Sequence, residues 1–124
     1  MTRQLFLICA GSGLSAILCA IQYLLIRRGR FHRNPFIGLT SSATRKSDEA
    51  WVRGHRAAAP WLARSGALCA VGSVVAGCGL AFARDGAWAT VFAIGGGVPL
   101  LLAIVLVTFV AKPAADRAAE SAEA

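Results

Sequence analysis

Residues 4–26 read QLFLICAGSGLSAILCAIQYLLI and contain no charged side chain. A helix needs about 20 apolar residues to cross the roughly 30 Å hydrocarbon core of a bilayer. Residues 65–83 and 86–111 form two further runs without a charge. Backbone polar groups inside lipid must pair within their own segment, so each run predicts a helix. The sequence therefore predicts an all-α protein with three transmembrane helices.

The composition also favours a membrane protein. Of the 124 residues, 56% are hydrophobic, and the mean hydropathy of +0.61 exceeds that of soluble domains. A chain of this length has room for one domain. We expect a single transmembrane domain over residues 1–113, with spans at about 5–26, 61–83 and 87–111, a motif segment at 27–60, and a flexible tail at 114–124.

Positive charge is concentrated between the first two spans. Nine of the thirteen Lys and Arg residues fall between Arg27 and Arg64, together with only two acidic residues. Basic loops mark the cytoplasmic side of a membrane protein and attract anionic lipid headgroups. We therefore expect a multi-pass protein of the cell membrane, with the N-terminus outside and the C-terminus in the cytoplasm. This placement favours membrane lipids over nucleic acid as partners of the basic segment.

Local signals predict a turn and a helix start within the motif segment. Asn34-Pro35 favours a turn, and Gly38 can adopt a positive φ. Ser47 is followed by two acidic residues, which is typical of a helix N-terminus. We therefore expect a structured connection between the first two spans.

The residues after Ser47 have a helical spacing. Trp51, His55 and Ala58 recur at intervals of four and three, and so share one face of a helix. This pattern predicts a short amphipathic helix lying in the membrane interface. Pro60 then either kinks this helix or opens the next one.

Apart from Arg64, near the start of the second span, the predicted spans carry no Asp, Glu, Lys, Arg or His. Such residues usually mark proton relays and ion pathways, so their absence disfavours a pump or channel. The four cysteines have no metal-binding spacing, and we expect no metal or cofactor. No nucleophile and base form a recognisable motif, so we do not expect an enzyme. Gly95–Gly97 and Pro99 should weaken the third span, and we favour accommodation of a bulky neighbour such as Trp88 or Phe92 over a hinge.

A set of polar and small residues stands at a distinctive spacing in the motif segment: Asn34, Gly38, Leu39, Thr44, Ser47, Trp51 and His55. This pattern resembles the signature of the SdpI family of small bacterial membrane proteins. The likeness covers about residues 34–61 and the flanking spans. One position departs from the pattern, because Thr40 stands where that family usually has a basic residue.

The resemblance implies an immunity or signalling protein that binds a toxin or a regulator. The residues expected to bind this protein partner are Asn34, Pro35, Gly38, Thr44, Arg45, Lys46, Ser47, Trp51 and His55. An alternative is a small accessory or structural subunit of a larger membrane complex, because small residues in the second and third spans suit further helix contacts. A weaker third reading is a transporter-like homo-oligomer with its path between subunits.

Overall fold

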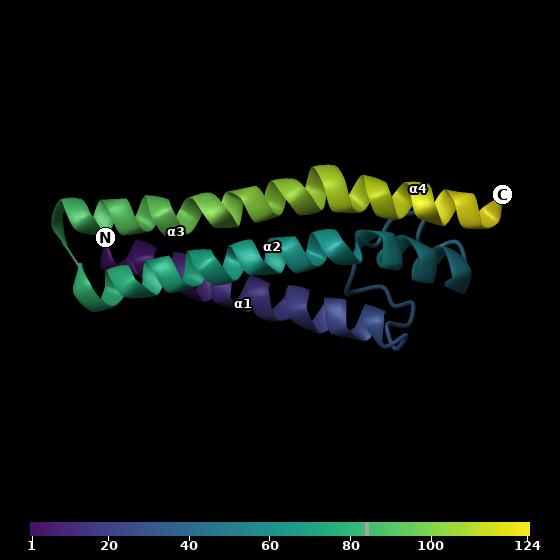
Figure 1. Cartoon of the computed structure of the whole chain (residues 1–124), viewed down its shortest axis with the longest axis horizontal. Helices are drawn as coiled ribbons and strands as arrows, with labels where there is room; N and C mark the ends of the chain where they lie inside the picture. The colour runs from purple at the N-terminus through teal and green to yellow at the C-terminus, as the bar shows by residue number, and fades with distance from the viewer. Residues whose placement is uncertain (84) are drawn as a thin grey trace. The chain divides into compact units, whose positions relative to one another are not determined.

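The computed structural model describes residues 1–83 and 85–124, and it is largely helical (Figure 1). Helix α1 covers Thr2–Arg27, α2 covers Asp48–Phe82, and α3 covers Gly86–Leu106. A short π-helical turn, η1 (Val107–Ala111), leads into α4 (Lys112–Glu123). The described residues include no strand, and the all-α prediction is confirmed. Arg84, between α2 and α3, lies outside the described residues.

Three helices are long and apolar enough to cross a membrane. They are α1, α2 and the continuous helix Gly86–Glu123 that α3, η1 and α4 form together. Large apolar side chains stay exposed on these helices: Leu14 is 60% exposed, Ile94 61% and Leu101 63%. Water would disfavour such faces, whereas lipid solvates them. The prediction of three spans is confirmed.

The expected amphipathic helix and the second span form one helix. Helix α2 begins directly after Ser47 and continues through Pro60. Proline removes one backbone hydrogen bond from a helix interior. Here its neighbours Ala58, Ala59 and Leu62 are buried, so packing favours a helix on both sides of Pro60. We place the membrane-spanning part of α2 from about Trp61 onward, because the uncharged run begins shortly after it, at Ser65.

The C-terminal residues differ from the flexible tail expected over 114–124. They belong to α4, in which Ala115 and Ala119 are fully buried. Ala111, Ala115 and Ala119 recur every four residues and so form one small-sided face of the helix. The alanine-rich composition of residues 114–124 predicts a flexible tail, because alanine side chains bury little apolar area. In the structure this face packs against the motif segment.

A π-helical turn precedes α4. In η1 the Lys112 N–H bonds to the Val107 carbonyl oxygen instead of to the oxygen four residues back. Pro113 follows directly, and it can donate no backbone hydrogen bond. The wider turn therefore lies where a regular helix would lose a bond in any case.

The chain divides into two compact units. One unit combines Met1–Leu18 with Arg64–Ile104, and the other combines Cys19–Ala63 with Val105–Ala124. The first unit contains much of the three apolar runs. The second contains the motif segment and α4.

Glycine allows close helix contact within the first unit. A Cβ atom on Gly72 would lie 2.6 Å from the carbonyl oxygen of Gly96, and one on Gly79 would lie 2.6 Å from Phe92 Cβ. The helices approach this closely only because these side chains are absent. Phe92 is thus accommodated by a glycine of α2, and α3 remains helical through Pro99. The small residues of α2 and α3 thus allow close helix packing within this unit, as we favoured from the sequence.

Candidate functional site

The end of α1 turns the chain into the motif segment (residues 27–60). The Arg30 N–H donates to the Leu25 carbonyl at 2.9 Å, and the Gly29 N–H donates to the Ile26 carbonyl at 3.1 Å. Gly29 has a φ of +65°, so this is the Schellman arrangement in which glycine ends a helix. Phe31, two residues after Gly29, is buried.

The loop tip is held by Asn34. Its Oδ1 atom accepts hydrogen bonds from the Phe36 N–H at 3.1 Å and the Ile37 N–H at 2.7 Å, while Nδ2 donates to the His32 carbonyl at 3.0 Å. A side chain that bonds nearby backbone groups in this way fixes a turn. Pro35 and Phe36 consequently stay exposed at the tip, and Phe36 is 89% exposed.

A second turn is held by hydroxyl groups. Thr44 Oγ1 accepts the Ser41 N–H at 2.9 Å and donates to the Leu39 carbonyl at 2.8 Å. Ser41 Oγ in return accepts the Thr44 N–H at 3.1 Å. Thr44 is fully buried, and these bonds satisfy its hydroxyl. Its role in this structure is therefore to fold the loop.

Ser47 caps α2 as the sequence predicts. Its Oγ accepts the Ala50 N–H at 3.1 Å, and Asp48 and Glu49 occupy the first turn. A hydroxyl bonded to the third residue of the helix satisfies a donor that the helix itself leaves unpaired. The start of α2 is thus fixed relative to the loop before it.

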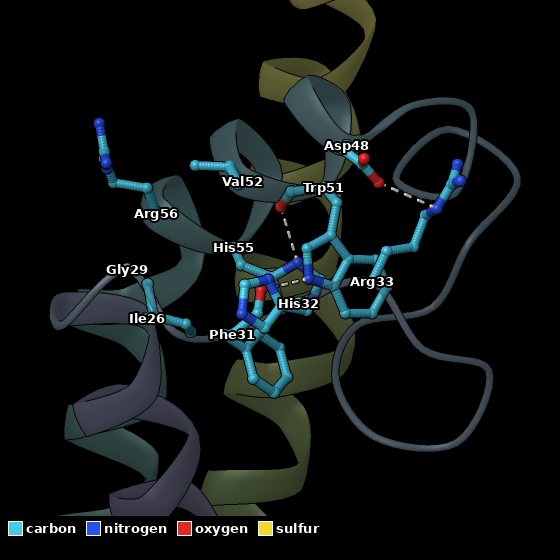
Figure 2. Close-up of a pocket in the computed structure, with 10 residues that line it drawn as sticks. All are labelled: Ile26, Gly29, Phe31, His32, Arg33, Asp48, Trp51, Val52, His55 and Arg56. Carbon is cyan, nitrogen blue, oxygen red and sulfur yellow. Dashed lines mark hydrogen bonds and ion pairs between the residues drawn. The ribbon is translucent and has the colours of Figure 1, made fainter.

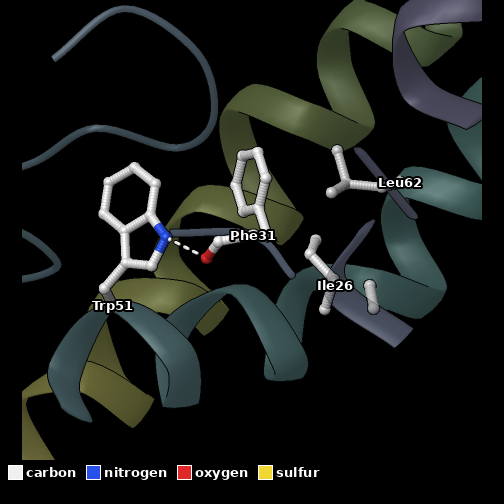
Figure 3. Packing of buried hydrophobic residues seen from close by; sticks show 5 residues of the cluster. Ile26, Phe31, Trp51 and Leu62 are labelled. Atoms are coloured by element: carbon white, nitrogen blue, oxygen red, sulfur yellow. Dashed lines mark hydrogen bonds between the residues drawn. The ribbon is translucent and has the colours of Figure 1, made fainter. Parts of the chain in front are cut away.

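Three rings form the centre of the motif segment. The ring centroids of Trp51 and His55 are 4.1 Å apart, and Phe31 lies 4.9 Å from His55 and 5.5 Å from Trp51. Trp51 Nε1–H donates to the Phe31 carbonyl at 2.9 Å, as Figure 3 shows, and Ile26 and Leu62 complete this cluster. Trp51 and His55 are each 1% exposed. The packing therefore ties α2 to the residues that follow α1.

His55 joins the loop to α2 through both ring nitrogens. Nε2 accepts the Leu39 N–H at 2.9 Å, so the proton of the neutral ring is on Nδ1, which donates to the Trp51 carbonyl at 2.9 Å. Burial lowers the pKa of His55 below its ordinary 6.5, and the bond to the Trp51 carbonyl opposes part of this effect. His55 precedes the membrane-spanning part of α2, and its neutral form fits the site.

Gly38 allows the loop to lie against this ring. Its φ is +110°, and a Cβ atom there would lie 2.6 Å from His55 Nε2 and 2.9 Å from two ring carbons of Phe31. Only glycine accepts both the backbone conformation and the contact without strain. This position explains the glycine of the sequence pattern as a packing requirement.

Helix α4 covers the other side of the loop. Leu39 and Ala58 pack with Ala111 and Ala115, and Ala43 and Ala50 pack with Ala119. The face of α2 that carries Trp51, His55 and Ala58 is therefore covered by protein. Residues distant in the sequence cover the apolar face, and the location of this helix in the membrane interface stays a prediction.

Two hydrogen bonds fasten α4 to the motif segment. Ser41 Oγ donates to Asp116 Oδ1 at 2.5 Å, and Ser47 Oγ donates to Glu123 Oε1. Gly54 lets the helices meet, since a Cβ atom there would lie 2.9 Å from the Ala115 carbonyl oxygen. The contact therefore combines small side chains with acid–hydroxyl bonds.

A cavity of about 300 Å³ opens between the end of α1 and the start of α2 (Figure 2). Phe31, Trp51 and His55 contribute its buried wall, and Arg33 and Asp48 form an ion pair at 3.3 Å on its rim. The remaining lining residues are Ile26, Gly29, His32, Val52 and Arg56. This volume is at the lower end for sites that bind small molecules.

The sequence that forms this site matches a known protein family. The model of the SdpI/YfhL protein family matches residues 30–111, which is most of the chain. The chain belongs to the SdpI/YfhL protein family. With its three apolar helices, this family member is a multi-pass membrane protein. No curated protein and no solved structure matches the chain.

The family match ends where α4 begins. It covers the loop, α2, α3 and η1, and it leaves out Lys112–Glu123. The acidic residues that hold Ser41 and Ser47 therefore lie beyond the matched region of this SdpI/YfhL family member. Thr40, which replaces the basic residue usual in the pattern, is half-buried, and its N–H donates to the Gly38 carbonyl at 3.0 Å.

The nine residues expected to bind a partner fall into two groups. Most of them build the fold of the loop: Asn34, Gly38, Thr44, Ser47, Trp51 and His55. Pro35, Arg45 and Lys46 are exposed. The structure therefore brings together Gly38, Trp51 and His55 as a core and leaves the second group on the surface of this SdpI/YfhL family member.

Several residues of the site were not singled out from the sequence. Phe31 and Ser41 gain their roles from contacts with residues far along the chain, and only the four-residue spacing of the C-terminal alanines could have indicated a partner for the loop. The described residues contain no cluster of three His, Cys, Asp or Glu that could hold a metal ion. The four cysteines are free thiols.

Proposed function

We propose that this chain is an immunity- or signalling-type binding protein of the cell membrane, which engages a toxin or regulator protein through the exposed side of its motif segment. One observation carries the proposal: the buried residues of the family pattern hold a loop that exposes Phe36 at 89% and Ile37 at 51%. Exposed apolar side chains on a fixed loop suit recognition by a protein partner.

Basic side chains add electrostatic attraction to this surface. Arg45 and Lys46 are exposed, and Arg33 Nη1 donates to the Arg45 carbonyl at 3.0 Å, which links the two arms of the loop. Charged groups at the edge of an interface mainly accelerate association and select partners. The favoured partner is therefore a protein with an acidic and apolar contact surface.

The orientation proposed for this surface is cytoplasmic. The excess of basic residues between Arg27 and Arg64 supports it. Contact between α4 and the motif segment supports placing the C-terminus on the same side as that segment. With three spans, the N-terminus would then lie outside the cell. A C-terminal reporter that is active only outside the cell would contradict this orientation.

Binding fits the segment better than catalysis. Both ring nitrogens of His55 are engaged by backbone groups, so neither is free to move a proton for a substrate. The Ser41 and Thr44 hydroxyls are likewise occupied in holding the turn. These bonds support the proposal of a non-enzymatic protein.

A complementation experiment tests the proposal. Cells lacking the gene would be challenged with a panel of membrane-active toxins and then supplied with the wild type, with Phe36→Ser or with Phe82→Ser. Phe82 is 86% exposed and lies at the far end of α2 from the motif segment, so it is a matched control. We expect the wild type and Phe82→Ser to restore resistance and Phe36→Ser to fail.

Two results would contradict this function. Unchanged sensitivity of the deletion strain across the panel would exclude immunity. A stoichiometric membrane partner that copurifies in mild detergent with both wild type and Phe36→Ser would instead identify an accessory subunit of a complex.

A further inference from the structure

We propose that the cavity between the end of α1 and the start of α2 binds the phosphate group of an anionic membrane phospholipid. This site uses residues other than Phe36, Arg45 and Lys46. The inference therefore stands or falls separately from the proposed function.

The position of the cavity suits a lipid headgroup. Ile26, the last residue of the first uncharged run, lines the cavity together with Gly29. A headgroup lies where such an apolar run ends and basic residues begin. A lipid whose chains lie beside α1 would therefore place its phosphate at the level of this cavity.

The charges around the cavity favour an anion. Arg33 and Arg56 line it with the polar His32, and Asp48 is the acidic residue of the lining. Figure 2 shows Arg33 and Arg56 on opposite sides of the ring cluster, with their guanidinium groups directed away from it. Arginine suits phosphate because its planar guanidinium group can donate two parallel hydrogen bonds. Both residues are exposed, so each side chain can turn toward a phosphate in the cavity.

The ion pair between Arg33 and Asp48 does not block such a ligand. The Arg33 side chain is 44% exposed and that of Asp48 is 87% exposed. Exposed ion pairs contribute little to stability and exchange readily. Arg56 forms no ion pair with the described residues, so its guanidinium group is available to a ligand. Arg33 pairs with Asp48 through Nε and donates to the Arg45 carbonyl through Nη1, so a phosphate would take up the remaining N–H groups of this guanidinium or replace the exposed carboxylate.

The wall of the cavity suits the part of a lipid next to its phosphate. Val52, which is 45% exposed, supplies the accessible aliphatic part of the wall, and the buried Ile26, Phe31 and Trp51 lie behind it. A volume of about 300 Å³ accommodates a phosphate and a glycerol unit but not two acyl chains. The chains would remain in the bilayer. A free inorganic phosphate would leave the apolar wall unused.

Native mass spectrometry of the full chain in a non-ionic detergent tests the site. Phosphatidylglycerol and phosphatidylcholine would be titrated in parallel, and inorganic phosphate would be added as a competitor. We expect bound phosphatidylglycerol to exceed phosphatidylcholine. Arg56→Gln and Arg33→Gln should each weaken phosphatidylglycerol binding about tenfold, as loss of a charge-assisted hydrogen bond implies.

Two further variants separate a built site from diffuse attraction. Arg28→Gln removes a charge from the same basic stretch but does not line the cavity, and it should leave binding near the wild-type level. Val52→Trp keeps every charge and fills the cavity, and it should weaken binding as strongly as Arg56→Gln. Near-ultraviolet circular dichroism of Trp51 and its neighbours would verify that each variant is folded.

Three results would overturn the inference. Equal losses in Arg28→Gln and Arg56→Gln would show that only overall charge matters. Full binding by a folded Val52→Trp variant would place the lipid elsewhere. Displacement by inorganic phosphate at an affinity equal to that of the lipid would identify a soluble phosphate as the ligand.

Discussion

Substituting Gly38 by alanine tests whether the loop depends on its contact with His55. The residue has a φ of +110°, and the new Cβ atom would lie 2.6 Å from His55 Nε2. A strained backbone conformation of this kind costs about 1–3 kcal/mol. Overpacking against buried rings adds a cost of about 1–3 kcal/mol. We therefore expect the motif segment to be destabilised by about 3 kcal/mol or more.

Hydrogen exchange at the Leu39 amide measures this effect. That amide donates to His55 Nε2, so it exchanges when the loop separates from α2. A destabilisation of about 3 kcal/mol corresponds to exchange more than about a hundredfold faster. Amides within the apolar part of α3 serve as an internal reference, because the substitution does not touch them.

Gly29→Ala is the matched control. Gly29 also has a positive φ, of +65°, but a Cβ atom there meets nothing within 4 Å. This variant should incur only the backbone cost, about 1–2 kcal/mol. Equal exchange rates at Leu39 in the two variants would refute the argument from collision. Wild-type protection in Gly38→Ala would refute the contact itself.

Three other predictions concern the same part of the chain. Below pH 6.5 the unfolded chain binds a proton that folded His55, with its lowered pKa, does not. Stability present in full above pH 6.5 should therefore fall as the pH drops toward the folded pKa, and thermal unfolding of wild type and His55→Gln over a pH series measures this slope. Ala115→Leu should loosen α4 by about 1–3 kcal/mol, whereas Ala114→Leu, at a half-buried position, should cost less in the same thermal scan. Ser47→Ala should destabilise the start of α2 by about 1 kcal/mol through loss of its cap, and unchanged denaturant midpoints would contradict this role.

The spans and the start of α2 could be predicted because their causes are local. An uncharged run such as residues 86–111 predicts a membrane helix wherever it occurs. The Ser47 hydroxyl and the two acids after it likewise act within one turn of helix. Neither conclusion depends on knowing which residues are neighbours in space.

The covering of α2 could not be predicted in the same way. The spacing of Trp51, His55 and Ala58 identifies an apolar face, but periodicity does not say what lies against it. Lipid and protein both satisfy such a face. Here Phe31 covers one end and Ala115 the other, and neither stands near α2 in the sequence.

The cavity depends still more on tertiary structure. Its lining combines residues around Gly29 with the first turns of α2, from Asp48 to Arg56. These two stretches meet because the Schellman turn redirects the chain and the Trp51 indole bonds to the Phe31 carbonyl. A basic stretch read from the sequence predicts attraction to a membrane surface but no specific site.

The alanine face of α4 gives this part of the chain two levels of stability. Alanine has no side-chain rotamers to lose when it is buried, and it removes little apolar area from water. Detaching α4 would therefore change the heat capacity only slightly, so that equilibrium would vary gently with temperature. The ring cluster of Phe31, Trp51 and His55 buries far more apolar area and would melt more steeply. Docking of α4 should therefore depend less on temperature than the folding of the ring cluster does.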